Sequence, residues 1–78
     1  ITIMAKVFTV AVRDPHSICL YDATTGSYEG IIYVTSGSII GNPVITSSSV
    51  SVTFTEHGST YMTIFDLPSK RFNKKIHI

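Results

Sequence analysis

The chain repeats itself at a distance of 44 residues. When residues 8–34 are placed on residues 52–78 without a gap, apolar positions fall on apolar positions and turns fall on turns. Tyr21 falls on Phe65, Asp22 on Asp66 and Ile32 on Ile76. A period of about 40–45 residues is typical of four-stranded β units. The repeat therefore predicts one domain over 1–78 with two related units, a first at 6–35 and a second at 36–78.

Alternation with a period of two predicts that these units are made of strands. Val50, Val52 and Phe54 alternate with Ser and Thr, which gives one apolar face and one hydroxyl face. No window has the i, i+3, i+4, i+7 spacing of a helix. Asp, Gly and Pro mark turns at even intervals between the runs. We expect strands at 6–12, 17–22, 29–35, 38–46, 49–56, 60–66 and 72–78.

The second unit resembles a blade of the β-propeller superfamily. Residues 39–45, with Gly and Pro, look like an innermost strand, and residues 50–55, 61–66 and 72–78 look like the three strands that follow it. The turn Tyr-Asp-Ala-Thr-Thr-Gly at 21–26 is similar to one common in quinoprotein-type propellers. The chain departs from quinoprotein and WD-repeat blades in having no Trp, and the first unit is an incomplete blade because only residues 1–5 precede it.

The resemblance implies an all-β fold of two four-stranded antiparallel, blade-like sheets that complete a propeller by oligomerisation. Propellers typically close at about 4–8 blades, so a trimer of two-blade chains is the simplest ring. A small β-sandwich or barrel is the alternative fold.

Size and composition also favour association. A chain of 78 residues has a small core, and Cys19 is the one cysteine, so no internal disulfide can form. Charged residues make up 14% of the chain, whereas twenty residues are Ser or Thr. Such a surface suits burial in an assembly or an extracellular setting, although strand propensity alone also favours Thr. We expect self-association or binding to other structural proteins, in a virion or outside the cell rather than in the cytoplasm.

A small β protein of low charge, rich in Ser and Thr, resembles in size and composition the decoration, neck and tail proteins of phage and other viral particles. The expected function is therefore that of a non-enzymatic structural or assembly module acting through protein–protein contacts. One alternative is an oligomeric glycan-binding lectin of the propeller type, against which the absence of Trp counts. Another is a subunit of a larger propeller scaffold.

No arrangement of residues predicts a catalytic, cofactor or metal site. The three histidines lie in two turns and the last strand without the spacing of metal ligands. Cys19 lies between Ile18 and Leu20, where a buried small apolar residue is expected. Asp22 and Asp66 are expected to cap turns.

Four residues are candidate contacts for a ligand or partner: Tyr33, Tyr61, Ser48 and Lys74. The two tyrosines fall on His77 and Ser17 in the repeat, so they lack the aromatic counterparts that assign Tyr21 and Tyr28 to the core. Ser48 is the middle of a three-serine loop.

Lys74 belongs to a basic segment in the last nine residues, although on a strand it points away from Lys75. Lysines on an edge strand also protect it from unwanted pairing. Nucleic acid is not an expected partner, because no Arg-rich stripe or aromatic platform accompanies the charge. No stretch approaches the about 20 apolar residues of a membrane helix, and residues 1–12 lack the charged start of a signal peptide.

Overall fold

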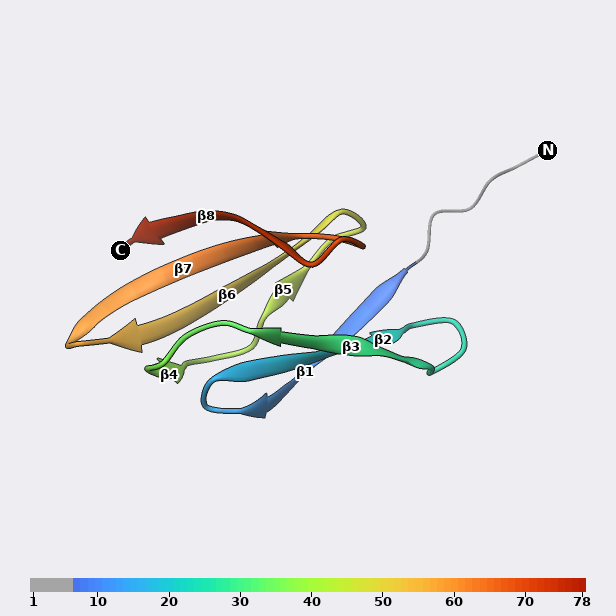
Figure 1. Ribbon diagram of the computed structural model, residues 1–78, viewed down its shortest axis with the longest axis horizontal. Coiled ribbons are helices and arrows are strands. Elements are labelled where there is room, and N and C mark those ends of the chain that lie inside the picture. Colours follow the sequence, from blue (N-terminus) through green and yellow to red (C-terminus); the bar gives the residue numbers. More distant parts are fainter. Residues whose placement is uncertain (1–6) are drawn as a thin grey trace.

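The computed structural model describes residues 7–78 and shows two antiparallel β-sheets and, within those residues, no helix (Figure 1). The first sheet has the order β1-β2-β3, from β1 (Phe8–Asp14), β2 (Ser17–Asp22) and β3 (Tyr28–Tyr33). The expected all-β antiparallel class is confirmed. The first predicted strand begins at residue 8 rather than 6, and residue 6 lies outside the described residues.

The second sheet is built on the three consecutive strands β6 (Ser49–Glu56), β7 (Ser59–Asp66) and β8 (Arg71–His77). Two short strands, β4 (Ser38–Ile39) and β5 (Val44–Ile45), both pair with β6. The single strand predicted at 38–46 is thus broken in two, because Gly41 takes a φ of 68° and Pro43 has no backbone N–H to donate. The sheets therefore have three and five strands rather than four each.

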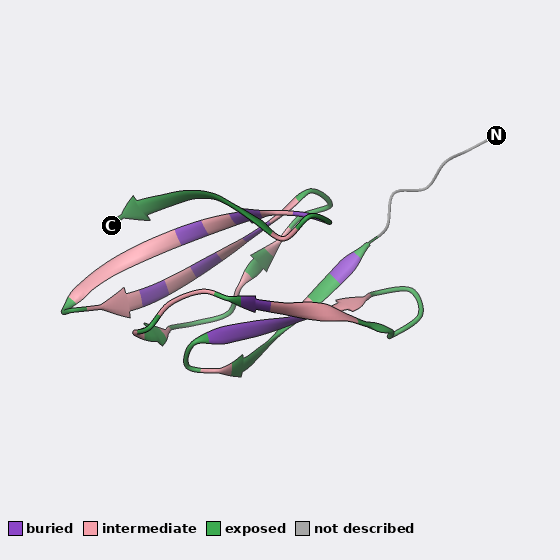
Figure 2. Cartoon of the chain, viewed as in Figure 1, coloured by how far each residue is buried: buried purple, intermediate pink, exposed green. Residues whose placement is uncertain are grey.

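The two sheets face each other and share one apolar core (Figure 1, Figure 2). On β6, buried Val50, Val52 and Phe54 alternate with half-buried Ser and Thr, as the period of two predicts. Removing a Val, Leu, Ile or Phe side chain from water contributes about 1.5–3 kcal/mol, so this core is the main source of stability. Its buried members are Phe8, Ile18, Leu20 and Ile32 from the first sheet and Val50, Val52, Phe65 and Leu67 from the second.

The repeat of 44 residues is reproduced in the backbone pairing of two hairpins, β2–β3 and β7–β8. Ile18 pairs with Ile32, and their counterparts Met62 and Ile76 pair in the same register. Each hairpin has a register shift at the same place, after Leu20 in the first and after the counterpart Ile64 in the second. Local sequence therefore gives both hairpins the same pairing.

The turns of these hairpins match as well. The N–H of Gly26 donates to the carbonyl of Asp22 over 2.7 Å, and the N–H of Lys70 donates to the carbonyl of Asp66 over 2.8 Å. Gly26 and Lys70 both have left-handed backbone conformations, with φ of 79° and 61°. Before each turn an aromatic residue meets the one that follows it edge to face, with centroid distances of 5.9 Å for Tyr21 and Tyr28 and 6.2 Å for Phe65 and Phe72.

The strands that precede these hairpins, β1 and β6, do not pair with them in the same register. Val10 pairs with Leu20, whereas its counterpart Phe54 pairs with Tyr61, three residues before Ile64. The two-residue turn at His57 and Gly58 has positive φ at both positions, which continues the ladder regularly to the end of both strands. Pro15, with its fixed negative φ, excludes this turn between β1 and β2, and a register shift precedes it instead.

Because the offset of three residues is odd, the two hairpins bury opposite faces. Leu20 points into the core, whereas its counterpart Ile64 lies on the outer face, in the row of Ser51 and Lys74. Conversely, Phe65 is buried in the core, whereas its counterpart Tyr21 lies on the outer face of the first sheet. The two sheets thus present different, not equivalent, sides to each other.

Candidate functional site

The residues that the structure describes, 7–78, contain no pocket and no group of three or more side chains that could hold a metal ion. None of the elements in this range is a helix able to cross a membrane. The candidate sites described below are surfaces and side-chain networks of residues 7–78.

The four predicted contact residues are not brought together. Tyr33 ends β3 and is 72% exposed, whereas Ser48 lies in the exposed turn between β5 and β6. The carbonyl of Ser48 accepts a hydrogen bond of 2.8 Å from the N–H of Leu67, which gives this turn a structural role. Lys74 pairs with Ile64 on the outer face of the second sheet, whereas Tyr61 pairs with Phe54 on the inner face.

Tyr61 is the centre of an aromatic row at the end of the second sheet. Its ring stacks on Phe54 with centroids 5.7 Å apart and lies 4.9 Å from the ring of His77. The Nζ of Lys75 lies 4.3 Å from the centroid of Tyr61, within the range of a cation–π interaction. Lys75, and not the predicted Lys74, is thus the lysine beside Tyr61, because the two side chains leave β8 on opposite faces.

Glu56 ties this aromatic row to the loop between the two sheets. Its carboxylate accepts hydrogen bonds from the hydroxyls of Thr35 at 2.8 Å and Ser36 at 3.4 Å, and it pairs with Lys75 at 3.4 Å. The Thr35 hydroxyl, followed by Lys75, holds the pKa of Glu56 below its ordinary value. These contacts hold the loop between the two sheets against the end of β6. Sequence reasoning missed it because Thr35 and Glu56 are distant along the chain.

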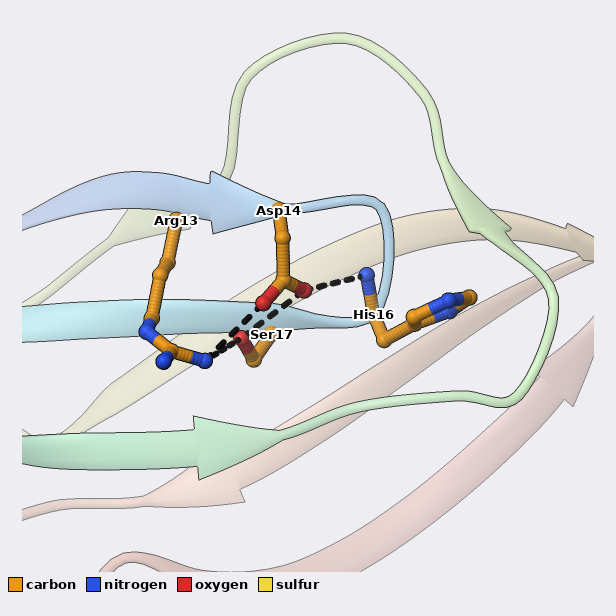
Figure 3. A network of polar contacts seen from close by, with 4 residues as sticks. All are labelled: Arg13, Asp14, His16 and Ser17. Atoms are coloured by element: carbon orange, nitrogen blue, oxygen red, sulfur yellow. Dashed lines mark hydrogen bonds and ion pairs between the residues drawn. The ribbon is translucent and has the colours of Figure 1, made fainter.

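A second polar network closes the turn between β1 and β2 (Figure 3). The Asp14 carboxylate accepts from the backbone N–H of His16 at 2.8 Å and from the hydroxyl of Ser17 at 3.0 Å, and it pairs with Arg13 at 2.9 Å. The N–H of His16 is the leading cause that lowers the pKa of Asp14. His16 takes part through its backbone N–H, and the network caps the turn.

The outer face of the second sheet carries apolar side chains that no other described element covers. Val44 is 65% exposed and Ile76 37% exposed, while Met62 and Ile64 are half-buried. The register places Thr53, Met62 and Ile76 in one row across β6, β7 and β8. We call this surface, together with Val44 and Ile64, the second outer face.

The outer face of the first sheet is also poor in charge at its centre. Ala11, Cys19 and Ile31 form one row across β1, β2 and β3. Cys19 is buried, as expected, whereas Ala11 is exposed and Ile31 half-buried. We call this surface, together with Tyr21 and Tyr33, the first outer face.

Tyr28 does not have the core role expected for it. Its ring is 58% exposed, and the ring of its counterpart Phe72 is 60% exposed. Both residues lie on edge strands beside a turn, where no further strand of their sheet covers them. The aromatic pairing of the repeat is therefore a feature of the hairpin rather than of the core.

Comparison of the chain with protein-family models, with curated proteins and with solved structures gave no match.

Proposed function

We propose that this protein is a non-enzymatic structural or assembly module that acts through protein–protein contacts made by its outer faces. The observation that carries the proposal is the second outer face, where Val44, Met62, Ile64 and Ile76 gather on one side of a sheet without a covering layer. A contiguous apolar surface on a small domain marks an interaction site.

The polar residues around this surface fit the same role. Ser51 and Thr53 lie among the apolar side chains of the second outer face on β6, and both are uncharged. Lys74, on the same face, lies at its rim on the edge strand β8. Charged residues are depleted at the centres of protein interfaces because removing them from water is costly. The ionised groups of the aromatic row, Glu56 and Lys75, are instead paired with each other and with loop hydroxyls.

A structural component of a virion is the setting that we propose for such a module. Particles of this kind are built from many copies of small chains, and the low charge and high Ser and Thr content of this chain suit a surface that is covered in the assembled state.

A lectin would need a concave sugar site, and because the described residues hold no pocket, that site would have to form between chains.

The test is the mass of the protein in solution, measured by light scattering after gel filtration. We expect the wild type to be an oligomer and Ile76→Lys to dissociate it, because a lysine in the apolar row of Thr53, Met62 and Ile76 would be buried without a partner. Val12→Lys is the matched control, since Val12 is 44% exposed but pairs with Ile18 on the inner side of β1. A folded wild type that remains monomeric at the highest soluble concentration would contradict the proposal.

A further inference from the structure

The second outer face is the repeat counterpart of the inner face of the first sheet. Met62, Ile64 and Ile76 lie 44 residues after Ile18, Leu20 and Ile32, and the two sets have the same pairing. Ile18 and Leu20 are fully buried and Ile32 is 4% exposed, because the second sheet covers them. The same three positions of the β7–β8 hairpin have no described sheet against them.

The first outer face is in turn the counterpart of the inner face of the second sheet. Tyr21 lies 44 residues before Phe65, and Cys19 lies 44 residues before Thr63. Phe65 and Thr63 are 6% and 3% exposed within the core between the sheets. Each free face is thus related by the repeat to a face that is already buried inside the chain.

Inside the chain, the inner face of the first sheet packs on the inner face of the second sheet, and these two faces are not counterparts in the repeat. The first and second outer faces, which are also not counterparts of each other, remain free. We propose that the partner is a second copy of this chain, which places its first outer face on the second outer face of its neighbour and so repeats the contact made within each chain. The inference rests on the proposed function. Contacts of this head-to-tail kind generate a closed ring if the rotation closes and an open stack if it does not.

The central rows of the two faces have side chains that suit this contact. In the row of Ala11, Cys19 and Ile31, Ala11 on β1 is small and exposed, and Cys19 on β2 is small and lies mostly below the surface. The row of Thr53, Met62 and Ile76 has larger side chains on β7 and β8. Large residues opposite small ones allow two layers to interdigitate at the density of a protein interior. None of these six side chains is charged. Lys74, which pairs with Ile64 in the neighbouring row of the second outer face, lies on the exposed edge strand β8, so in this contact it stays at the rim.

Two complementary variants test the arrangement, one with each face blocked. Ala11→Lys blocks the first outer face and Ile76→Lys blocks the second, and Ala11 is exposed, so its change leaves the core intact. We expect each variant alone to be monomeric. An equimolar mixture should form a one-to-one heterodimer, because each variant retains the face that the other lacks, and native mass spectrometry would resolve the two masses.

Other outcomes overturn the inference. If Ile76→Lys still forms a homodimer while Ala11→Lys does not, the first outer face pairs with itself, and the converse result shows the same for the second. A mixture that stays monomeric while the wild type is oligomeric also rejects head-to-tail contact but leaves the proposed function standing. A monomeric wild type rejects both. Should either variant lose its β-sheet circular dichroism, Tyr33→Lys and Val44→Lys replace them, since these side chains are 72% and 65% exposed.

Discussion

The hairpins β2–β3 and β7–β8 have the same register, the same register shift, after Leu20 and after Ile64, and the same turn contacts, yet they bury opposite faces. The difference arises in the strand that precedes each hairpin, because β6 is offset by three residues relative to β1. The comparison shows that local sequence sets the geometry of a hairpin, whereas its neighbours decide which side is buried.

The largest expected effect comes from truncating counterparts that point in opposite directions. Leu20→Ala should lower the free energy of unfolding by about 2–5 kcal/mol because it opens a cavity in the shared core. Ile64→Ala, on the outer face, should cost less than about 1 kcal/mol in the monomer. Urea denaturation at low protein concentration measures both. Equal costs would mean that the two hairpins bury the same face.

A second, smaller effect on stability is expected from the buried hydroxyl of Thr63, the counterpart of Cys19 in the repeat. The Oγ1 of Thr63 is buried and has no hydrogen-bond partner among the described residues. This hydroxyl lies in the core because the β7–β8 hairpin buries the face opposite to the one that β2–β3 buries. Thr63→Val keeps the shape and removes the unpaired group, so we expect a gain of about 1–2 kcal/mol. Thr55→Val is the control in thermal unfolding, since Thr55 lies half-buried on the outer face opposite Thr60, outside the row of Met62, and its change should have little effect. A loss of stability in Thr63→Val would show that the hydroxyl is paired.

A smaller effect is expected at the turn position that Gly26 shares with Lys70. Left-handed backbone is strained for residues with a Cβ, so Gly26→Ala should cost about 1 kcal/mol and Lys70→Gly should gain a few tenths to about 1 kcal/mol. The gain is limited because the stem of Lys70 lies against Gly30 of the first sheet. Chemical denaturation of both variants checks the signs. The same sign for both changes would mean that the two turns are not equivalent.

The smallest effect is expected from two acids, Asp14 at the end of β1 and Glu56 at the end of β6. Their pKa values are lowered in the folded state, so the stability they contribute is present above their unfolded pKa and is lost as the pH falls through the folded value. We expect Asp14→Asn and Glu56→Gln each to flatten the fall in melting temperature below about pH 5. A profile that keeps the slope of the wild type would show that these contacts are absent in solution.

Much of the fold was predictable because it depends on local pattern. The alternation on β6 and the turns at Asp22 and Asp66 located the strands within a few residues, and the repeat located the paired hairpins. The break between Ile39 and Val44 was not predicted, because a run of apolar residues reads as one strand whether or not a Gly turns it.

The candidate surfaces were harder to predict, because they depend on pairing between distant segments. The offset of β6 follows from turn geometry at His57 and Gly58, and it alone decides that Met62 faces outward. The bond from Thr35 to Glu56 joins residues 21 positions apart. Neither the alternation nor the repeat predicts such contacts. The sequence therefore identified Tyr61 as a candidate contact but did not identify the residues around it.

The break between β4 and β5 affects whether many copies of this chain can gather without forming amyloid fibrils. A strand added at that edge would meet an interrupted ladder at Gly41 and Pro43, and at the opposite edge it would meet β8, which is exposed along its whole length and carries Arg71, Lys74 and Lys75 (Figure 2). Amyloid growth requires uninterrupted strands stacked edge to edge with little charge. The second sheet lacks such an edge on either side. When copies of the chain are crowded together, this sheet should therefore form contacts through its face rather than edge-to-edge fibrils.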